Sequence, residues 1–171
     1  MRTTLLLTAV GTDKTGLVDS LAQRIAAAGG NWEESRLARL GGQFAGIVLV
    51  TIDDSKTDAL IAKLRELEGA GLQVTSRVVP PPPAAESGSR VKVAVTGNDR
   101  PGIVRDVARI LAERGVNVEE LESSIASAPM SGESMFVVRA KLLVPSTLEL
   151  SILRVALEAL GNELMVDLVS E

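Results

Sequence analysis

Two short polar segments with one shared residue pattern are the part of the chain best suited to bind a ligand. Gly11–Val18 reads GTDKTGLV, and Gly97–Val104 reads GNDRPGIV, 86 residues later. Each segment follows an apolar run typical of a strand and precedes apolar residues at helical spacing. The N–H groups that begin a helix bind anions such as carboxylates. The pattern therefore predicts a binding turn for a small anion, built twice.

The glycine of each turn leaves the main chain accessible to a ligand. The alternative is a capped helix start that binds nothing, in which Asp13 or Asp99 accepts hydrogen bonds from the first helical turn. We favour binding because the pattern occurs twice and Gly-x-Asn follows each copy at the same distance. Pro101 also suits the first helical position. The predicted binding residues are Asp13, Lys14, Thr15, Gly16 and Leu17 in the first turn, and Asp99, Arg100, Pro101, Gly102 and Ile103 in the second.

Asn31 and Asn117 occupy matching positions, each at the start of the strand expected after the first helix. A side-chain amide accepts a hydrogen bond from an amino group or donates one to a carboxylate. Asparagine also adopts left-handed backbone in turns. A ligand-binding role and a structural role therefore both stay open for these two residues.

Residue types that commonly carry catalysis are missing. The chain has no cysteine and no histidine, which excludes disulfides, thiolate zinc sites and cysteine nucleophiles and removes the usual neutral-pH base. The serines around the second long hairpin have no base partner in the sequence. Strand alternation places the members of each glutamate pair on opposite faces, so they form no acid/base dyad. We expect no enzyme, no cofactor and no metal; the pairs are Glu33–Glu34 and Glu119–Glu120.

The charge distribution argues against nucleic-acid binding. The net charge is −4, residues 1–79 are balanced, and residues 80–171 carry the whole excess of acid. Arg105 and Arg109 lie one helical turn apart, with Asp106 and Glu113 nearby, which favours a solvated face over a phosphate-binding stripe. The apolar runs are too short to span a bilayer, and the N-terminus leads into a strand without a signal peptide. We expect a cytoplasmic protein without membrane contact.

The repeat divides the chain into two small domains, residues 1–79 and 90–171, joined by a proline-rich linker at 80–89. Four consecutive prolines favour an extended polyproline II spacer. Domains of about 80 residues bury a limited core, so packing of the halves or dimerisation is expected to help them. Aromatic residues make up only 2% of the chain, so the cores must be aliphatic.

Each half follows the order β-α-β-β-α-β. This order predicts an α+β fold of the ferredoxin-like type, an antiparallel four-stranded sheet with two helices on one face. Asp53, Asp54 and Ser55 are expected to cap the second helix, and Pro145, Ser146 and Thr147 to begin the fourth. Strands are expected at residues 3–10, 31–40, 44–52 and 72–79, and at 91–96, 116–126, 135–144 and 164–169.

These features resemble the ACT domain, a ligand-binding module of amino-acid metabolism, in tandem over nearly the whole chain. The resemblance is carried by the DKTG and DRPG turns, the apolar helix after each, and the segment GGNWEESRLARLGGQF. The first half is similar to the two-ACT repressors of the glycine cleavage system. The second half departs from them by its longer hairpin loop and by NVEELESS in place of NWEESRLA.

The resemblance implies that a small amino acid, such as glycine, binds at interfaces between ACT units. Asn31 and Asn117 would face the two turns there. It also implies repression of transcription through a partner DNA-binding regulator. We expect the chain to form a homo-oligomer, a dimer. A ligand-free module for protein interaction or oligomerisation is the alternative.

Overall fold

The computed structural model describes residues 1–80, 88–127, 134–161 and 165–170. The chain divides into two compact units, Met1–Pro83 (unit 1) and Ala84–Glu171 (unit 2). Most of the predicted linker and of the loop Ser127–Ser134 lies outside the described residues. In the part of the chain that is described, no helix is long and apolar enough to cross a membrane.

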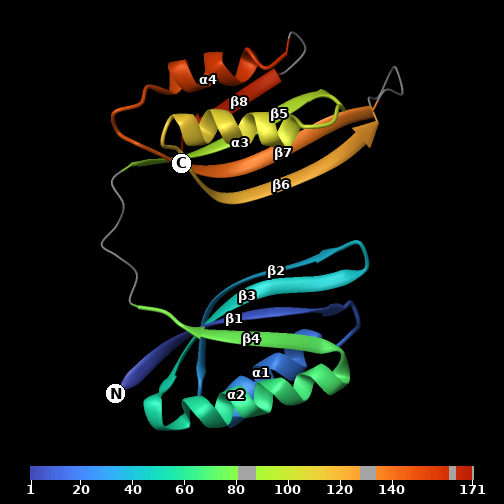
Figure 1. The fold of residues 1–171 in the computed structure, drawn as a ribbon, viewed down its shortest axis with the longest axis vertical. Coiled ribbons are helices and arrows are strands. Elements are labelled where there is room, and N and C mark those ends of the chain that lie inside the picture. Colours follow the sequence, from blue (N-terminus) through green and yellow to red (C-terminus); the bar gives the residue numbers. More distant parts are fainter. Residues whose placement is uncertain (81–87, 128–133, 162–164, 171) are drawn as a thin grey trace. The chain divides into compact units, whose positions relative to one another are not determined.

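Unit 1 is a four-stranded antiparallel sheet in the order β2-β3-β1-β4, with both long helices on one face (Figure 1). The repeat-based prediction of a ferredoxin-like βαββαβ unit is confirmed. Short 3₁₀ helices flank α2, at Asp54–Lys56 and Glu66–Ala70. The elements are β1 (Arg2–Thr12), α1 (Leu17–Ala27), β2 (Asn31–Leu40), β3 (Gln43–Asp53), α2 (Thr57–Arg65) and β4 (Leu72–Val78).

Unit 2 has the same topology, with the sheet order β6-β7-β5-β8. Its fourth helix begins later than predicted, at Leu150, because a turn closed by the Leu148 N–H and the Pro145 carbonyl (2.9 Å) precedes it. The elements are β5 (Ser89–Asn98), α3 (Ile103–Glu113), β6 (Asn117–Ser127), β7 (Ser134–Val144), α4 (Leu150–Glu158) and β8 (Met165–Ser170).

Aliphatic side chains form the core of each unit, between the sheet and its two helices. In unit 1, Leu5 and Leu7 of β1 are fully buried against Leu21 of α1 and Leu60 of α2. Buried residues of α1 recur every four positions, at Leu17, Leu21 and Ile25, as expected for a helix with one apolar face. The packed face fixes the position of each helix start, and therefore of each turn.

Gly11 allows the end of β1 to approach the segment that leads into β4. A Cβ at Gly11 would collide with the carbonyl oxygen of Gly71, a main-chain atom that no rotamer change can move. Gly71 itself has φ +84°, a left-handed conformation that favours glycine. This close approach explains how the end of β1 pairs with the start of β4, where Gly11 lies opposite Leu72.

Gly11→Ala is expected to lower the free energy of unfolding of unit 1 by about 1–3 kcal/mol, the usual range for overpacking. Gly69→Ala is the matched control, because a Cβ there has no heavy atom within 4 Å. Urea unfolding of the full chain followed by circular dichroism measures both. Equal midpoints for the two variants would contradict the contact.

Candidate functional site

The two predicted turns adopt the same backbone conformation. Gly16 has φ 93° and ψ 1°, and Gly102 has φ 89° and ψ 4°, each directly before the first residue of a helix. Leu17 and Ile103 follow them and are 5% and 3% exposed. The side chains of Leu17 and Ile103 therefore pack into the core. Only the main-chain groups of these two residues can contact a ligand.

The aspartates of the turns do not cap the helices, contrary to the structural alternative considered for them. Neither α1 nor α3 has a side-chain hydrogen bond at its N-cap. The Asp13 carboxylate instead accepts from Arg39 Nε at 2.7 Å. The main-chain N–H groups of Asp13 and Asp99 donate to the carbonyls of Gly42 and Ser134. Each turn is thus held against the neighbouring hairpin, while the helix start keeps its N–H groups for other acceptors.

The basic side chain of each turn contacts the main chain just after the second long helix of its unit. Lys14 Nζ donates to the Ala70 carbonyl, and Arg100 Nη2 donates to the Leu160 carbonyl at 3.4 Å. A cation at carbonyl groups that end a helix is favourable. The side chains of Lys14 and Arg100 therefore link each turn to the segment that follows the second long helix of the same unit. Pro101 lies ahead of the N-cap Gly102, not at the first helical position as predicted, because α3 begins at Ile103.

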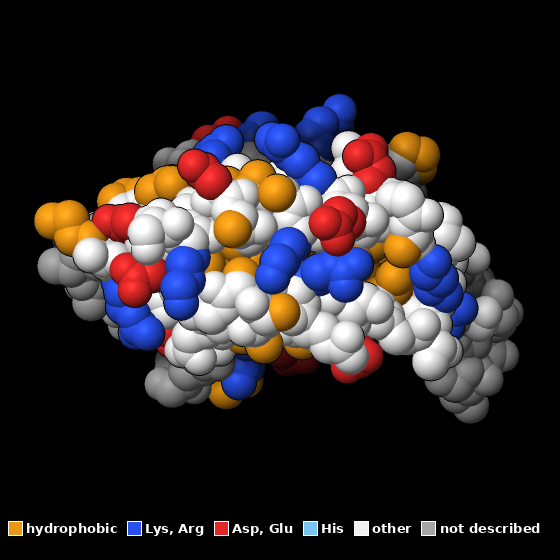
Figure 2. Space-filling view, turned by 90° about the horizontal axis from the view of Figure 1, so that it is seen from below, with side chains coloured by type: hydrophobic (Ala, Val, Ile, Leu, Met, Phe, Trp, Pro, Cys, Tyr) orange, Lys and Arg blue, Asp and Glu red, His pale blue; other side chains and the backbone are white. Residues whose placement is uncertain are grey.

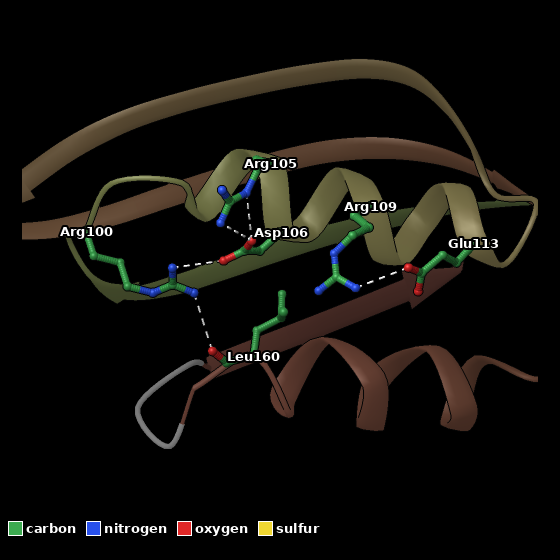
Figure 3. Close-up of polar contacts among 6 residues, drawn as sticks. All are labelled: Arg100, Arg105, Asp106, Arg109, Glu113 and Leu160. Carbon is green, nitrogen blue, oxygen red and sulfur yellow. Dashed lines mark hydrogen bonds and ion pairs between the residues drawn. The ribbon is translucent and has the colours of Figure 1, made fainter.

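The surroundings of the two glycines differ. In the part of the chain that the structure describes, a Cβ at Gly16 would have no heavy atom within 4 Å, whereas one at Gly102 would lie 3.2 Å from Arg105 Nη2. Arg105 donates to Asp106 Oδ1 at 3.0–3.1 Å, and Arg100 Nη1 donates to Asp106 Oδ2 at 2.9 Å (Figure 3). These bonds, with that from Arg100 the larger influence, hold the pKa of Asp106 below its ordinary value. The first turn is open, and the second is covered by its own side chains.

The asparagines do not lie beside the turns of their own units. Asn31 is opposite Thr51 on β3, whereas Thr12, at the end of β1, is opposite Gln43. Eight residues of strand separate these positions, or about 26 Å at about 3.3 Å per residue. In unit 2, Asn117 pairs with Leu143, and Asn98, at the end of β5, pairs with Met135. These two partners are likewise eight residues apart on β7. Within one unit, Asn31 and Asn117 therefore do not face the turns.

A β-bulge places both glutamates of each pair on the outer, helix-free face of the sheet. The pairing of β2 with β3 shifts between Trp32 and Glu34, which makes Glu33 the extra residue. Glu33 Oε1 accepts from Thr51 Oγ1 at 2.6 Å and from Asn31 Nδ2 at 2.8 Å. The hydrogen bond from Thr51, followed by that from Asn31, lowers the pKa of Glu33. The predicted alternation of Glu33 and Glu34 is wrong because of the bulge.

The same bulge occurs in unit 2, between Val118 and Glu120. Glu119, the counterpart of Glu33, accepts three hydrogen bonds from Arg90 at 3.1–3.2 Å. Glu120 pairs with Lys141 Nζ at 2.9 Å. Sequence reasoning missed the carboxylates at the bulges as site candidates, although Asn-x-Glu recurs in both halves. The described residues contain no cluster that could hold a metal ion.

Family models describe both halves of the chain in the same way. A model of the ACT domain matches residues 3–76, and a second model of the ACT domain matches residues 91–148. The chain belongs to the ACT-domain family. Units 1 and 2 are two ACT domains in tandem, and their matching sheet orders agree with this.

Relatives of the tandem ACT chain include proteins named as transcriptional repressors. It is 28% identical over 167 residues to the glycine cleavage system transcriptional repressor of Escherichia coli (strain K12), covering 94% of this chain and 85% of that protein. The repressor of Shigella flexneri matches with the same values. The crystal structure of an unknown protein from Galdieria sulphuraria has a TM-score of 0.83 at 27% identity, covering 100% of this chain and 99% of that one.

Asp106→Asn is expected to lower the melting temperature of the ACT chain at neutral pH, because it removes the acceptor of Arg100 and Arg105. The native pKa of Asp106 is lowered from 3.8, so its contribution is complete above pH 3.8 and is lost as the pH falls through the native pKa. Thermal melts of wild type and variant should therefore converge at low pH.

Asp19→Asn is the matched control, since Asp19 also lies in the first turn of its helix but accepts from the uncharged Gln23 (2.9 Å). A difference between wild type and Asp106→Asn that stays constant down to acidic pH would contradict the role of the ion pairs.

Proposed function

We propose that the chain is a non-enzymatic regulator that binds a small amino acid, with glycine the first candidate, and controls transcription through a partner protein. The observation that carries the proposal is the open turn at Gly16. Among the described residues, the start of α1 has no side-chain cap, and a Cβ at Gly16 would meet no heavy atom within 4 Å. The family and the named activity of the repressor relatives support the regulatory role. A catalytic function has less support, because the chain has neither histidine nor cysteine.

The proposed ligand is a zwitterion whose two charged groups need different partners. Its carboxylate is held by the N–H groups of the turn and the first residues of α1, from Asp13 to Leu17. Its ammonium group is held by the side-chain oxygen of an asparagine, Asn31 or Asn117. Residues Asp99, Arg100, Pro101, Gly102, Ile103 and Asn117 form the corresponding set in unit 2.

A single small amino acid cannot bridge about 26 Å, so turn and asparagine must come from two different ACT units. We infer a homodimer in which such an interface forms. The ligand then shifts the chain toward the arrangement that it binds better, by an amount set by its differential affinity. This shift would alter contact with the partner, which we propose to be a DNA-binding regulator in the cytoplasm.

The charge of the surface supports a protein partner over direct contact with nucleic acid. Figure 2 looks onto the helix-bearing face of unit 1, where Lys and Arg side chains are interspersed with Asp, Glu and apolar ones. On this face Arg24 of α1 lies 3.7 Å from Glu66. Strong DNA binding needs several cations that neutralise neighbouring phosphates, and the net charge of −4 works against it.

A thermal-shift screen of the purified full chain against the twenty amino acids tests the function. A ligand that binds only the native state raises the free energy of unfolding, by about 2.7 kcal/mol at a hundredfold excess over its Kd. The melting temperature rises as a result. We expect a saturable rise with glycine or another small amino acid. A flat response to all twenty would contradict sensing and favour the ligand-free interaction module.

Gly16→Leu is expected to weaken binding of the amino acid at least tenfold, because the side chain would occupy the space through which the ligand reaches the main chain. Gly41→Leu is the matched control. Gly41 also has positive φ (57°) and open space around it, but it lies in the hairpin turn between β2 and β3. Calorimetric titration measures the affinity of both variants for the amino acid and so distinguishes an effect of backbone strain from loss of the binding site. Equal affinities for the two variants would show that Gly16 is not part of the site.

A further inference from the structure

We propose that the helix-free face of unit 2 binds a small zwitterion with an aliphatic side chain, in a hollow above Ala94. The hollow has a volume of about 320 Å³, and sites for small molecules commonly have volumes of about 300–1,000 Å³. It lies on the face of the sheet away from α3 and α4 (Figure 1). Neither glycine turn contributes to its lining, so this inference goes beyond the proposed function and does not depend on it.

The small side chain of Ala94 creates the hollow, because its neighbours across the sheet are longer and charged. Ala94 lies opposite Arg139 on β7 and opposite Asp167 on β8. Arg139 and Asp167 are therefore two strand spacings apart, about 10 Å, and a polar contact of about 3 Å at each end leaves about 4 Å. A carboxylate and an ammonium group on one carbon atom suit this gap.

Basic side chains gather beside the hollow on the two central strands, β5 and β7. Lys92 lies directly opposite Lys141, and Arg139 precedes Lys141 by two residues and so shares its face of β7. Like charges directly opposite each other destabilise a sheet. The matching pair in unit 1 is Leu6 and Leu49, so the fold itself does not need cations at these positions. The three cations favour an anionic group on a bound molecule.

Acidic side chains line the hollow from the two edge strands. Glu120 and Glu122 lie on β6 and Asp167 lies on β8, so the lining carries three acids and three bases. Glu120 pairs with Lys141 Nζ at 2.9 Å. Among the residues that the structure describes, Arg139 forms no ion pair with Glu122, its cross-strand neighbour, or with Asp167. One cation and two carboxylates are thus available to a zwitterion, whereas an ion of a single sign would meet repulsion from one set.

Val169 gives the hollow an apolar wall. It lies opposite Lys92, and 63% of its surface is exposed. The methylene groups of Lys92 add apolar surface beside it, since lysine keeps only its charged end in water. An aliphatic group on the ligand would bury the side chain of Val169, which glycine could not do. The expected ligand is therefore an aliphatic amino acid, with L-valine as the first probe.

Amide chemical shifts of the ¹⁵N-labelled full chain, titrated with L-valine, test the proposal without any variant. We expect saturable shifts in three segments of unit 2, at residues 92–94, 139–141 and 167–169. Two analogues of L-valine carry only one of its charges: 3-methylbutanoate lacks the ammonium group and isobutylamine lacks the carboxylate. Each should bind at least tenfold more weakly, because it leaves one set of charges unpaired. Equal affinity of L-valine and either analogue would overturn the assignment of a zwitterion site.

Two variants of the full chain locate the site. Ala94→Leu fills the hollow and Arg139→Gln removes the partner of the carboxylate, so each should lower the affinity for L-valine at least tenfold. Thr8→Leu is the matched control, because Thr8 occupies the position of Ala94 in unit 1, opposite Ile47. Circular dichroism checks that all three variants keep the wild-type spectrum.

The outcomes for the hollow and for the proposed function are distinguishable. Wild-type affinity in both Ala94→Leu and Arg139→Gln, or L-valine shifts confined to the glycine turns, would overturn the site above Ala94 while the sensor function stands. Shifts at the hollow that both variants abolish, together with no effect of any amino acid at the turns, would support this site and overturn the proposed one at Gly16.

Discussion

Burial of one aliphatic sheet face under two helices is the constraint on which each unit depends. With aromatic residues at 2% of the chain, each core of a small domain relies on closely spaced Leu, Val and Ile side chains. The position of each helix is set by this packing, and the turn before the helix follows from it. The binding chemistry proposed for Gly16 would therefore lie in the main chain, whose position the core fixes, more than in any exposed side chain.

Duplication has given the chain two turns of one backbone conformation and two different electrostatic environments. Gly16 and Gly102 differ by only a few degrees in φ and ψ, yet one turn is open and the other is covered by Arg105. Side chains around a conserved backbone can thus change its chemistry without changing its fold, which agrees with the rule that function resides in sites carried by folds.

The fold was predictable from the sequence, and much of the site geometry was not. Repeated helical spacing and paired glycines gave the order of elements, and Gly41–Gly42 gave the hairpin. The position of Asn31 depends on strand order, because β1 and β2 run in the same direction on either side of β3. The bulge at Glu33 interrupts alternation, and its sequence signal is subtle: Trp32 and Leu37, five positions apart, both pack against the core.

The bulge also bears on strand length. Asn31 and Trp32 pair with Thr51 and Val50, and Glu34 continues directly with Leu49, so the ladder would close without residue 33. The same holds for residue 119 in the other half. Each sheet thus contains one residue that the pairing of its strands does not need and whose side chain does not contribute to the core. A one-residue deletion there would shorten the strand without changing which side chains face inward, and would remove a surface carboxylate together with its hydrogen bonds.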